Sequence, residues 1–193
     1  GRWGAKTPGN VFWIPEIADD FPKAKFLLLY RDGRDVATDL VDTEWGPNNL
    51  YTAALLWKDY MTAIREAESI LGSERFLRVR YEHLVRRPEE VVEGICSFLG
   101  ISYDPLMLRY HEKTPDSFMS KGYHAKSSMP ITDRFVGIYR TLPPSDRELL
   151  SGVIGDLLEA LGYEIETPGR EPGFWERLRY LEEDRHGGQI LEG

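Results

Sequence analysis

The segment Lys25–Asp39 constrains the fold of this chain more than any other stretch of its sequence. Its first part, Phe26–Tyr30, is a short apolar run of the kind found in strands that are covered on both faces. Gly33 then permits a sharp turn, and Asp32 or Asp35 can cap a following helix. The segment therefore predicts a buried strand, a polar turn and the start of a helix.

Two arginines lie where this strand is expected to end. In open α/β sheets ligands bind at the carboxyl ends of the strands, and helix N-termini there favour anions. Arg31 and Arg34 add planar sets of donors that suit phosphate or sulfate oxygens. The alternative is a solvated turn in which these arginines pair with Asp32 and Asp35.

Two sequence motifs resemble one enzyme family. Residues 30–37, with the sequence YRDGRDVA, resemble the 3′-phosphate-binding segment of sulfotransferases that use 3′-phosphoadenosine 5′-phosphosulfate (PAPS). Residues 80–84 (RYEHL), with Pro88-Glu89-Glu90 and Phe98-Leu99-Gly100 after them, resemble a second region of the same family. The resemblance covers roughly residues 3–163.

The resemblance implies roles for three residues in these motifs. Arg31 would bind the 3′-phosphate of PAPS, and Arg34 would support the turn beside it. Tyr81, at the end of the second strand, would contact the adenine. For Tyr81 the alternative is a tyrosine that closes the core.

A third segment implies a return of the chain to the 3′-phosphate. Residues 128–131 and 136–140 resemble a late family segment that brings a basic residue and a glycine to this group. Gly137 and Arg140 take these places, with Arg134 as second choice for the basic residue. The alternative for either arginine is a surface charge. Tyr139 stands where the family pattern has tryptophan.

The catalytic candidates are Lys6 and His124. Lys6-Thr7-Pro8 matches a lysine element that lies near the transferred sulfonate in the family, where positive charge favours transfer of a charged group. A plain surface lysine is the alternative. His124, His111 and Glu44 are conceivable general bases for the acceptor, and geometry has to decide among them.

Asp39 is the main departure from the family pattern at the cofactor site. The family commonly has serine eight residues after the phosphate-binding arginine, and here that position is Asp39. An ionised carboxylate repels a phosphate. Thr38 is about 100° away on a helix and cannot simply substitute.

A second departure concerns the Gly/Ser-rich loop that holds the 5′-phosphosulfate in family members. The sequence shows no such loop before Lys6 or later. We expect residues 1–163 to form the latter part of the family fold, with the N-terminal strand and loop absent, and residues 164–193 to be an acidic extension. We also expect these 193 residues to belong to a longer protein and, alone, to be poorly soluble, self-associated or inactive.

Composition excludes several classes of protein. The net charge of -8 argues against nucleic acid as the main partner. No apolar run approaches a membrane span, and no signal-peptide pattern opens the sequence, which favours a cytoplasmic protein. The single cysteine, Cys96, excludes an internal disulfide, and the sequence has no Cys/His cluster with the spacing of metal ligands.

The predicted fold is α/β, with a mainly parallel sheet, helices on both faces and the P-loop-containing nucleotide hydrolase-like architecture of sulfotransferases. Helical spacing and Gly or Pro signals predict the remaining elements. These are helices beginning at Ile14, over Leu50–Leu71, Pro88–Leu99, Tyr103–Glu112, Pro144–Leu161 and around Phe174–Leu181, and a second strand over Arg75–Arg80.

The predicted function is transfer of a sulfonate from PAPS to an acceptor hydroxyl or amine, without a metal. One alternative is a truncated or degenerate domain that binds a nucleotide or a partner without turnover. The other is a P-loop kinase of another family.

Overall fold

A computed structural model describes residues 3–113 and 129–188 of the chain. Its sheet has two parallel strands, β1 (Phe26–Tyr30) and β2 (Phe76–Arg80), with Phe26 opposite Phe76 and Tyr30 opposite Arg80. Parallel strands need a long crossover connection, and here it contains α2 (Gly33–Leu40) and α3 (Leu50–Leu71).

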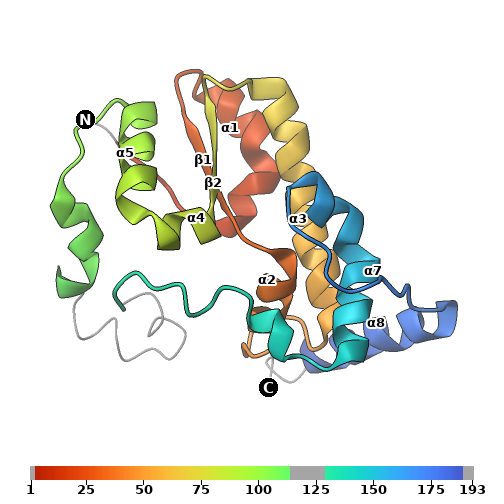
Figure 1. The fold of residues 1–193 in the computed structure, drawn as a ribbon. Helices are drawn as coiled ribbons and strands as arrows, with labels where there is room; N and C mark the ends of the chain where they lie inside the picture. Colours follow the sequence, from red (N-terminus) through yellow and green to blue (C-terminus); the bar gives the residue numbers. More distant parts are fainter. Residues whose placement is uncertain (1–2, 114–128, 189–193) are drawn as a thin grey trace.

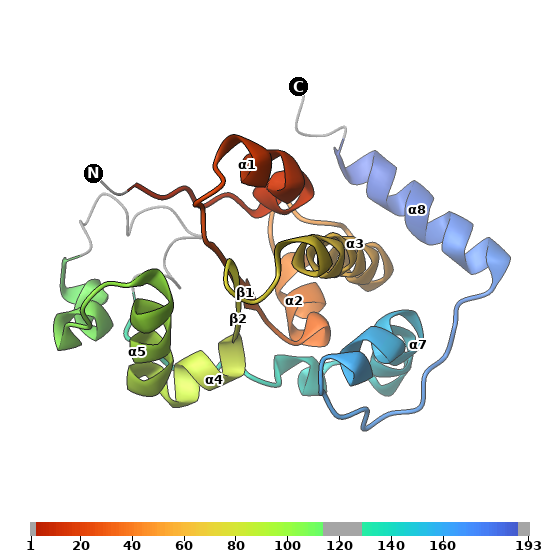
Figure 2. The same cartoon turned by 90° about the horizontal axis from the view of Figure 1, so that it is seen from above.

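Helices lie on both sides of this sheet, as the two views show (Figures 1 and 2). The predicted α/β architecture with helices on both faces is therefore confirmed. One side carries α1 (Ile14–Asp20), α2, α3 and α7 (Pro144–Ala160), and the other carries α4 (Tyr81–Arg86) and α5 (Pro88–Leu99). The other described elements are η1 (Pro8–Trp13), η2 (Pro105–Lys113), η5 (Ile138–Thr141) and α8 (Phe174–Gly188).

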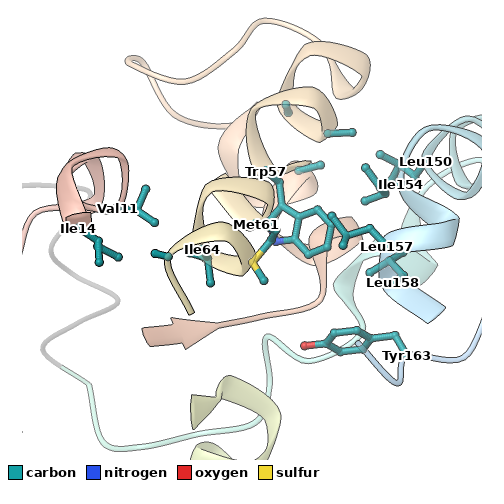
Figure 3. Packing of buried hydrophobic residues seen from close by; sticks show 14 of the residues in the cluster. Val11, Ile14, Trp57, Met61, Ile64, Leu150, Ile154, Leu157, Leu158 and Tyr163 are labelled. Carbon is teal, nitrogen blue, oxygen red and sulfur yellow. The ribbon is translucent and has the colours of Figure 1, made fainter. Parts of the chain in front are cut away.

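The core lies between α3 and α7 (Figure 3). Trp57 and Met61 of α3 belong to the same buried cluster as Ile154 and Leu158 of α7. Gly33, the first residue of α2, packs directly against this core, since a Cβ there would lie 2.6 Å from Trp57 Cδ2. Gly33 does not have a positive φ. The structure therefore needs glycine at this position for space, and not for the turn conformation that the sequence suggests.

Most helix boundaries agree with the sequence-based predictions. α3 and α5 end where Gly72 and Gly100 adopt φ values of 70° and 66°, which glycine reaches without steric cost. Residues 105–113 form a 3-10 helix, and α8 continues to Gly188, beyond the predicted Leu181. No helix in the described ranges is long and apolar enough to cross a membrane.

The prediction that β1 is covered on both faces is wrong. Leu27 and Leu29 are 44% and 51% exposed, while Phe26, Leu28 and Tyr30 pack against the core. α5 packs against β2, where Val79 is buried, and leaves Leu27 and Leu29 of β1 exposed. Within residues 3–113 and 129–188, β2 is the only strand that pairs with β1. β1 is therefore an edge strand in this part of the chain, with an open outer face.

Candidate active site

The turn after β1 is held by Asp32, which caps α2. Asp32 Oδ1 accepts hydrogen bonds from Arg34 N at 2.9 Å and from Arg34 Nε at 3.0 Å, and Asp32 Oδ2 accepts from Arg34 Nη2 at 2.7 Å. The Arg34 guanidinium lies 4.1 Å from the centre of the Tyr139 ring, and the residue is only 3% exposed. Burial alone would lower the pKa of Arg34, but the hydrogen bonds and charge of Asp32 outweigh it and raise that pKa.

The Arg34–Asp32 pair is the contact that the alternative interpretation of the turn expected, but it is buried and not solvated. The two guanidinium nitrogens of Arg34 that contact Asp32, Nε and Nη2, are used inside the turn. Arg34 therefore supports the turn and does not present these donors to a ligand.

Arg31 has a different set of partners. Its Nη1 donates to Asp39 Oδ2 on α2, and its Nη2 donates to the backbone oxygen of Phe135. The guanidinium carbon lies 5.1 Å from the centre of the Tyr81 ring. Arg31 Nε is buried and has no hydrogen-bond partner among the described residues. Arg31 thus joins the end of β1, the start of α4 and the segment before η5.

Asp35 fastens the late segment to α2. It is 1% exposed, and its carboxylate accepts from Gly137 N at 2.7 Å and from Tyr139 N at 3.1 Å. Burial raises the pKa of Asp35, although these two hydrogen bonds and the charge of Arg31 lower it. Gly137 has a φ of 79°, which favours glycine. Sequence reasoning considered Asp35 only as a helix cap or an arginine partner and missed this role.

Arg140 faces a carboxylate outside the turn. Its guanidinium donates to both oxygens of Glu166, with Nε 3.1 Å from Oε2. This hydrogen bond lowers the pKa of Glu166 and raises that of Arg140. Arg134, the second choice, lies over the Phe135 ring and contacts Met129 Sδ.

Glu82 is a further site residue, and sequence analysis assigned it no role. It is buried, and its Oε1 accepts from Asp32 N at 2.9 Å. Its Oε2 accepts from Tyr163 Oη at 3.0 Å and from Arg80 Nε at 3.3 Å. The signal for Glu82 in the sequence was the position of an acidic residue directly after Tyr81, which stands at the end of the second strand. Glu82 joins the ends of both strands to the residue that follows α7.

The structure brings together Arg31, Asp39, Tyr81 and Gly137, four of the predicted cofactor-site residues. Lys6 is exposed in the segment before η1. His124 lies outside the described residues, so its role stays a prediction.

The two other candidate bases are placed, and their roles also stay predictions. His111 lies in η2, and its buried Nδ1 has no hydrogen-bond partner within the described ranges. Glu44 is exposed in the turn after α2. In the described part of the chain, no group of three or more His, Cys, Asp or Glu residues could hold a metal ion.

Comparison with known proteins identifies sequence relatives. The family model described as "Sulfotransferase family" matches residues 1–105. Protein-tyrosine sulfotransferase 2 of Gallus gallus is 35% identical over 97 residues, which cover 48% of this chain and 26% of that protein. Protein-tyrosine sulfotransferase A of Caenorhabditis elegans is 27% identical over 168 residues, covering 82% of this chain and 43% of that protein. The chain therefore spans less than half the length of these relatives.

A solved structure has the same fold. The sulfotransferase domain from the curacin biosynthetic pathway aligns with a TM-score of 0.65 and 22% identity, covering 83% of this chain and 62% of that domain. This likeness confirms the predicted P-loop-like architecture.

Proposed function

Because the chain belongs to the sulfotransferase family, we propose that it takes part in transfer of a sulfonate from PAPS to an acceptor hydroxyl or amine. In this reaction the bond between sulfur and the phosphate oxygen of the donor breaks, and the acceptor oxygen or nitrogen bonds to sulfur. The proton of the acceptor passes to a general base. The family membership favours this reaction over phosphoryl transfer by a P-loop kinase.

The observation that carries the proposal is the position of Arg31. It lies directly after β1, where ligands bind in open α/β sheets, and its guanidinium is next to the ring of Tyr81. A guanidinium beside an aromatic ring suits a nucleotide, since one binds phosphate and the other stacks on a base.

The remaining residues take supporting roles in the proposal. Arg34 and Asp32 hold the turn, and Asp35 keeps the segment around Gly137 next to Arg31. Lys6 would lie at the sulfonate, and His124 would serve as the base. Arg140 would be released from Glu166 if it contacts the nucleotide.

Two relatives are named for protein tyrosine as the acceptor. We propose a tyrosine hydroxyl in a peptide as the first acceptor to test on this chain. A peptide with phenylalanine in place of the tyrosine is the matched control, because it differs only by the acceptor oxygen.

One observation favours a second candidate function, nucleotide binding without turnover. Arg31 is already paired with Asp39, so the chain's own carboxylate competes with a phosphate of the donor. Such a domain would bind the nucleotide product and fail to transfer sulfonate.

Calorimetric titration with adenosine 3′,5′-bisphosphate and with ATP, followed by incubation with radiolabelled PAPS and the tyrosine peptide, tests these functions. Tighter binding of the bisphosphate than of ATP and label on the tyrosine peptide alone is the expected result. Tighter binding of the bisphosphate without transfer to any hydroxyl or amine acceptor supports the second candidate. Tighter binding of ATP contradicts the proposal and supports a kinase.

A further inference from the structure

The guanidinium of Arg31 is occupied by groups of the chain itself. Nη1 donates to a carboxylate oxygen of Asp39, and Nη2 donates to the backbone oxygen of Phe135. Carboxylate and phosphate use the same planar set of guanidinium donors. Asp39 therefore occupies the position on Arg31 that an anionic group of a ligand would take.

The turn as a whole also lacks a surplus of positive charge. Arg31 pairs with Asp39 and lies 3.7 Å from Asp35, while Arg34 pairs with Asp32. The two guanidinium groups thus face three carboxylates. A doubly charged phosphate that reaches Arg31 has to replace Asp39 there, and it then stays close to like charges.

We propose that Asp39 is a specificity-determining residue that lowers the preference of this site for a nucleotide 3′-phosphate over a free 3′-hydroxyl. This inference rests on the proposed function, in which the 3′-phosphate binds at Arg31. A ribose hydroxyl can donate a hydrogen bond to a carboxylate, as an acidic residue accepts one from ribose in dinucleotide-binding folds. A phosphate has no such favourable contact with Asp39.

The position of Asp39 permits the exchange that this role requires. Its side chain is 26% exposed on α2, whereas Asp35 is 1% exposed and holds two backbone amides. Of the two carboxylates beside Arg31, Asp39 is thus the more exposed one, and Asp35 is the one fixed to the backbone of the late segment. A 3′-phosphate therefore binds more weakly, because the Arg31–Asp39 pair has to break when it binds.

Titrations of the full 193-residue chain with adenosine 3′,5′-bisphosphate and with adenosine 5′-phosphate test this role. Asp39→Asn keeps the shape of the side chain and removes its charge. We expect the Kd for the bisphosphate to fall about tenfold, which corresponds to about 1.4 kcal/mol. The Kd for the monophosphate should change less than about twofold, because it has no 3′-phosphate to compete for Arg31 and the amide oxygen of Asn can still accept a hydrogen bond from its 3′-hydroxyl. Asp39→Ser, a smaller side chain with a hydroxyl donor, should change the ratio of the two constants in the same direction.

Asp42→Asn is the matched control, since it removes the same charge from an exposed position just after α2. It should leave the ratio within about twofold of the original. A ratio that stays unchanged in both Asp39 variants contradicts the role of Asp39. If Arg31→Ala then still weakens the bisphosphate selectively, the proposed function stands without that role. If neither nucleotide binds the original chain or Asp39→Asn, the result contradicts both the proposed function and the role of Asp39.

Discussion

The two arginines of the turn after β1 carry the same chemical group in different surroundings. Arg34 is 3% exposed and directs its donors at Asp32, the cap of its own helix. The Arg31 side chain is 15% exposed, and its partners come from the far end of α2 and from Phe135. The Arg34 guanidinium thus serves the turn that holds it, whereas Arg31 links two separate segments and is the arginine to which the proposed function assigns a ligand.

Removal of the buried Arg34–Asp32 pair should have the strongest effect, a loss of stability. Arg34→Met keeps much of the apolar stem but leaves Asp32 as a buried charge without its partner. Removal of one member of a buried ion pair costs about 3–5 kcal/mol. Chemical denaturation of both chains measures the difference in the free energy of unfolding.

Arg87→Met is the control for this variant, because Arg87 forms an exposed pair with Glu90. Its cost should stay within about 1 kcal/mol. Equal losses in the two variants would contradict the structural role of the Arg34–Asp32 pair.

The next effect concerns binding at the Arg31 side. Arg31→Ala should weaken adenosine 3′,5′-bisphosphate by about 1.5–3 kcal/mol, the scale of a hydrogen bond to a charged group. Adenosine 5′-phosphate should be affected much less, because it lacks the 3′-phosphate. Paired calorimetric titrations measure both constants, and the same loss for both nucleotides would remove Arg31 from this role.

The smallest effect concerns Glu166, which lies near Arg34. Glu166 pairs with Arg140 and accepts a hydrogen bond from Tyr139 Oη at 3.3 Å. The hydrogen bond from Arg140 lowers the pKa of Glu166 below its ordinary value of 4.5. A carboxyl whose pKa is lowered in the folded state stabilises the fold at pH values above its ordinary pKa. This contribution disappears as the pH falls through the lowered pKa.

Glu166→Gln should therefore lower the stability at pH 7 by less than about 1 kcal/mol, since the pair is largely exposed. The difference in Tm between the two chains should shrink below pH 4.5, the ordinary value. Melting curves recorded from pH 7 down to pH 3 measure this trend. A Tm difference that stays constant over the whole range would mean that Glu166 does not stabilise the fold by this charge.

Local signals predicted most of the fold. The helices Leu50–Leu71 and Pro88–Leu99 end at glycines that adopt positive φ values, and such residues are visible in sequence. The open face of β1 was not predictable in this way. An apolar run does not reveal whether a helix lies over it, and α5 covers the neighbouring strand.

The family resemblance implied that Arg31, Tyr81 and Gly137 share one site, but individual contacts were predictable only where one motif contains both partners. Asp32 and Arg34 belong to the same turn, and their pairing was among the expected alternatives. The pair between Arg31 and Asp39 depends on how the arginine side chain folds along α2, which spacing alone does not fix. The contact of Asp35 with Gly137 joins residues 102 positions apart, and no local pattern encodes it.

That last contact also bears on the order in which the molecule assembles. The hydrogen bonds that close the site join residues 102, 104 and 81 positions apart, from Asp35 to Gly137 and Tyr139 and from Glu82 to Tyr163. Closing such long loops costs chain entropy before any contact is gained. The core between α3 and α7 joins residues that are about as far apart in the chain, so the core and these hydrogen bonds close the same long loop. In the proposed function, a nucleotide bound at Arg31 and Tyr81 would help to keep this long loop closed. Ligand binding should therefore increase the order of the segment around Gly137 and Tyr139.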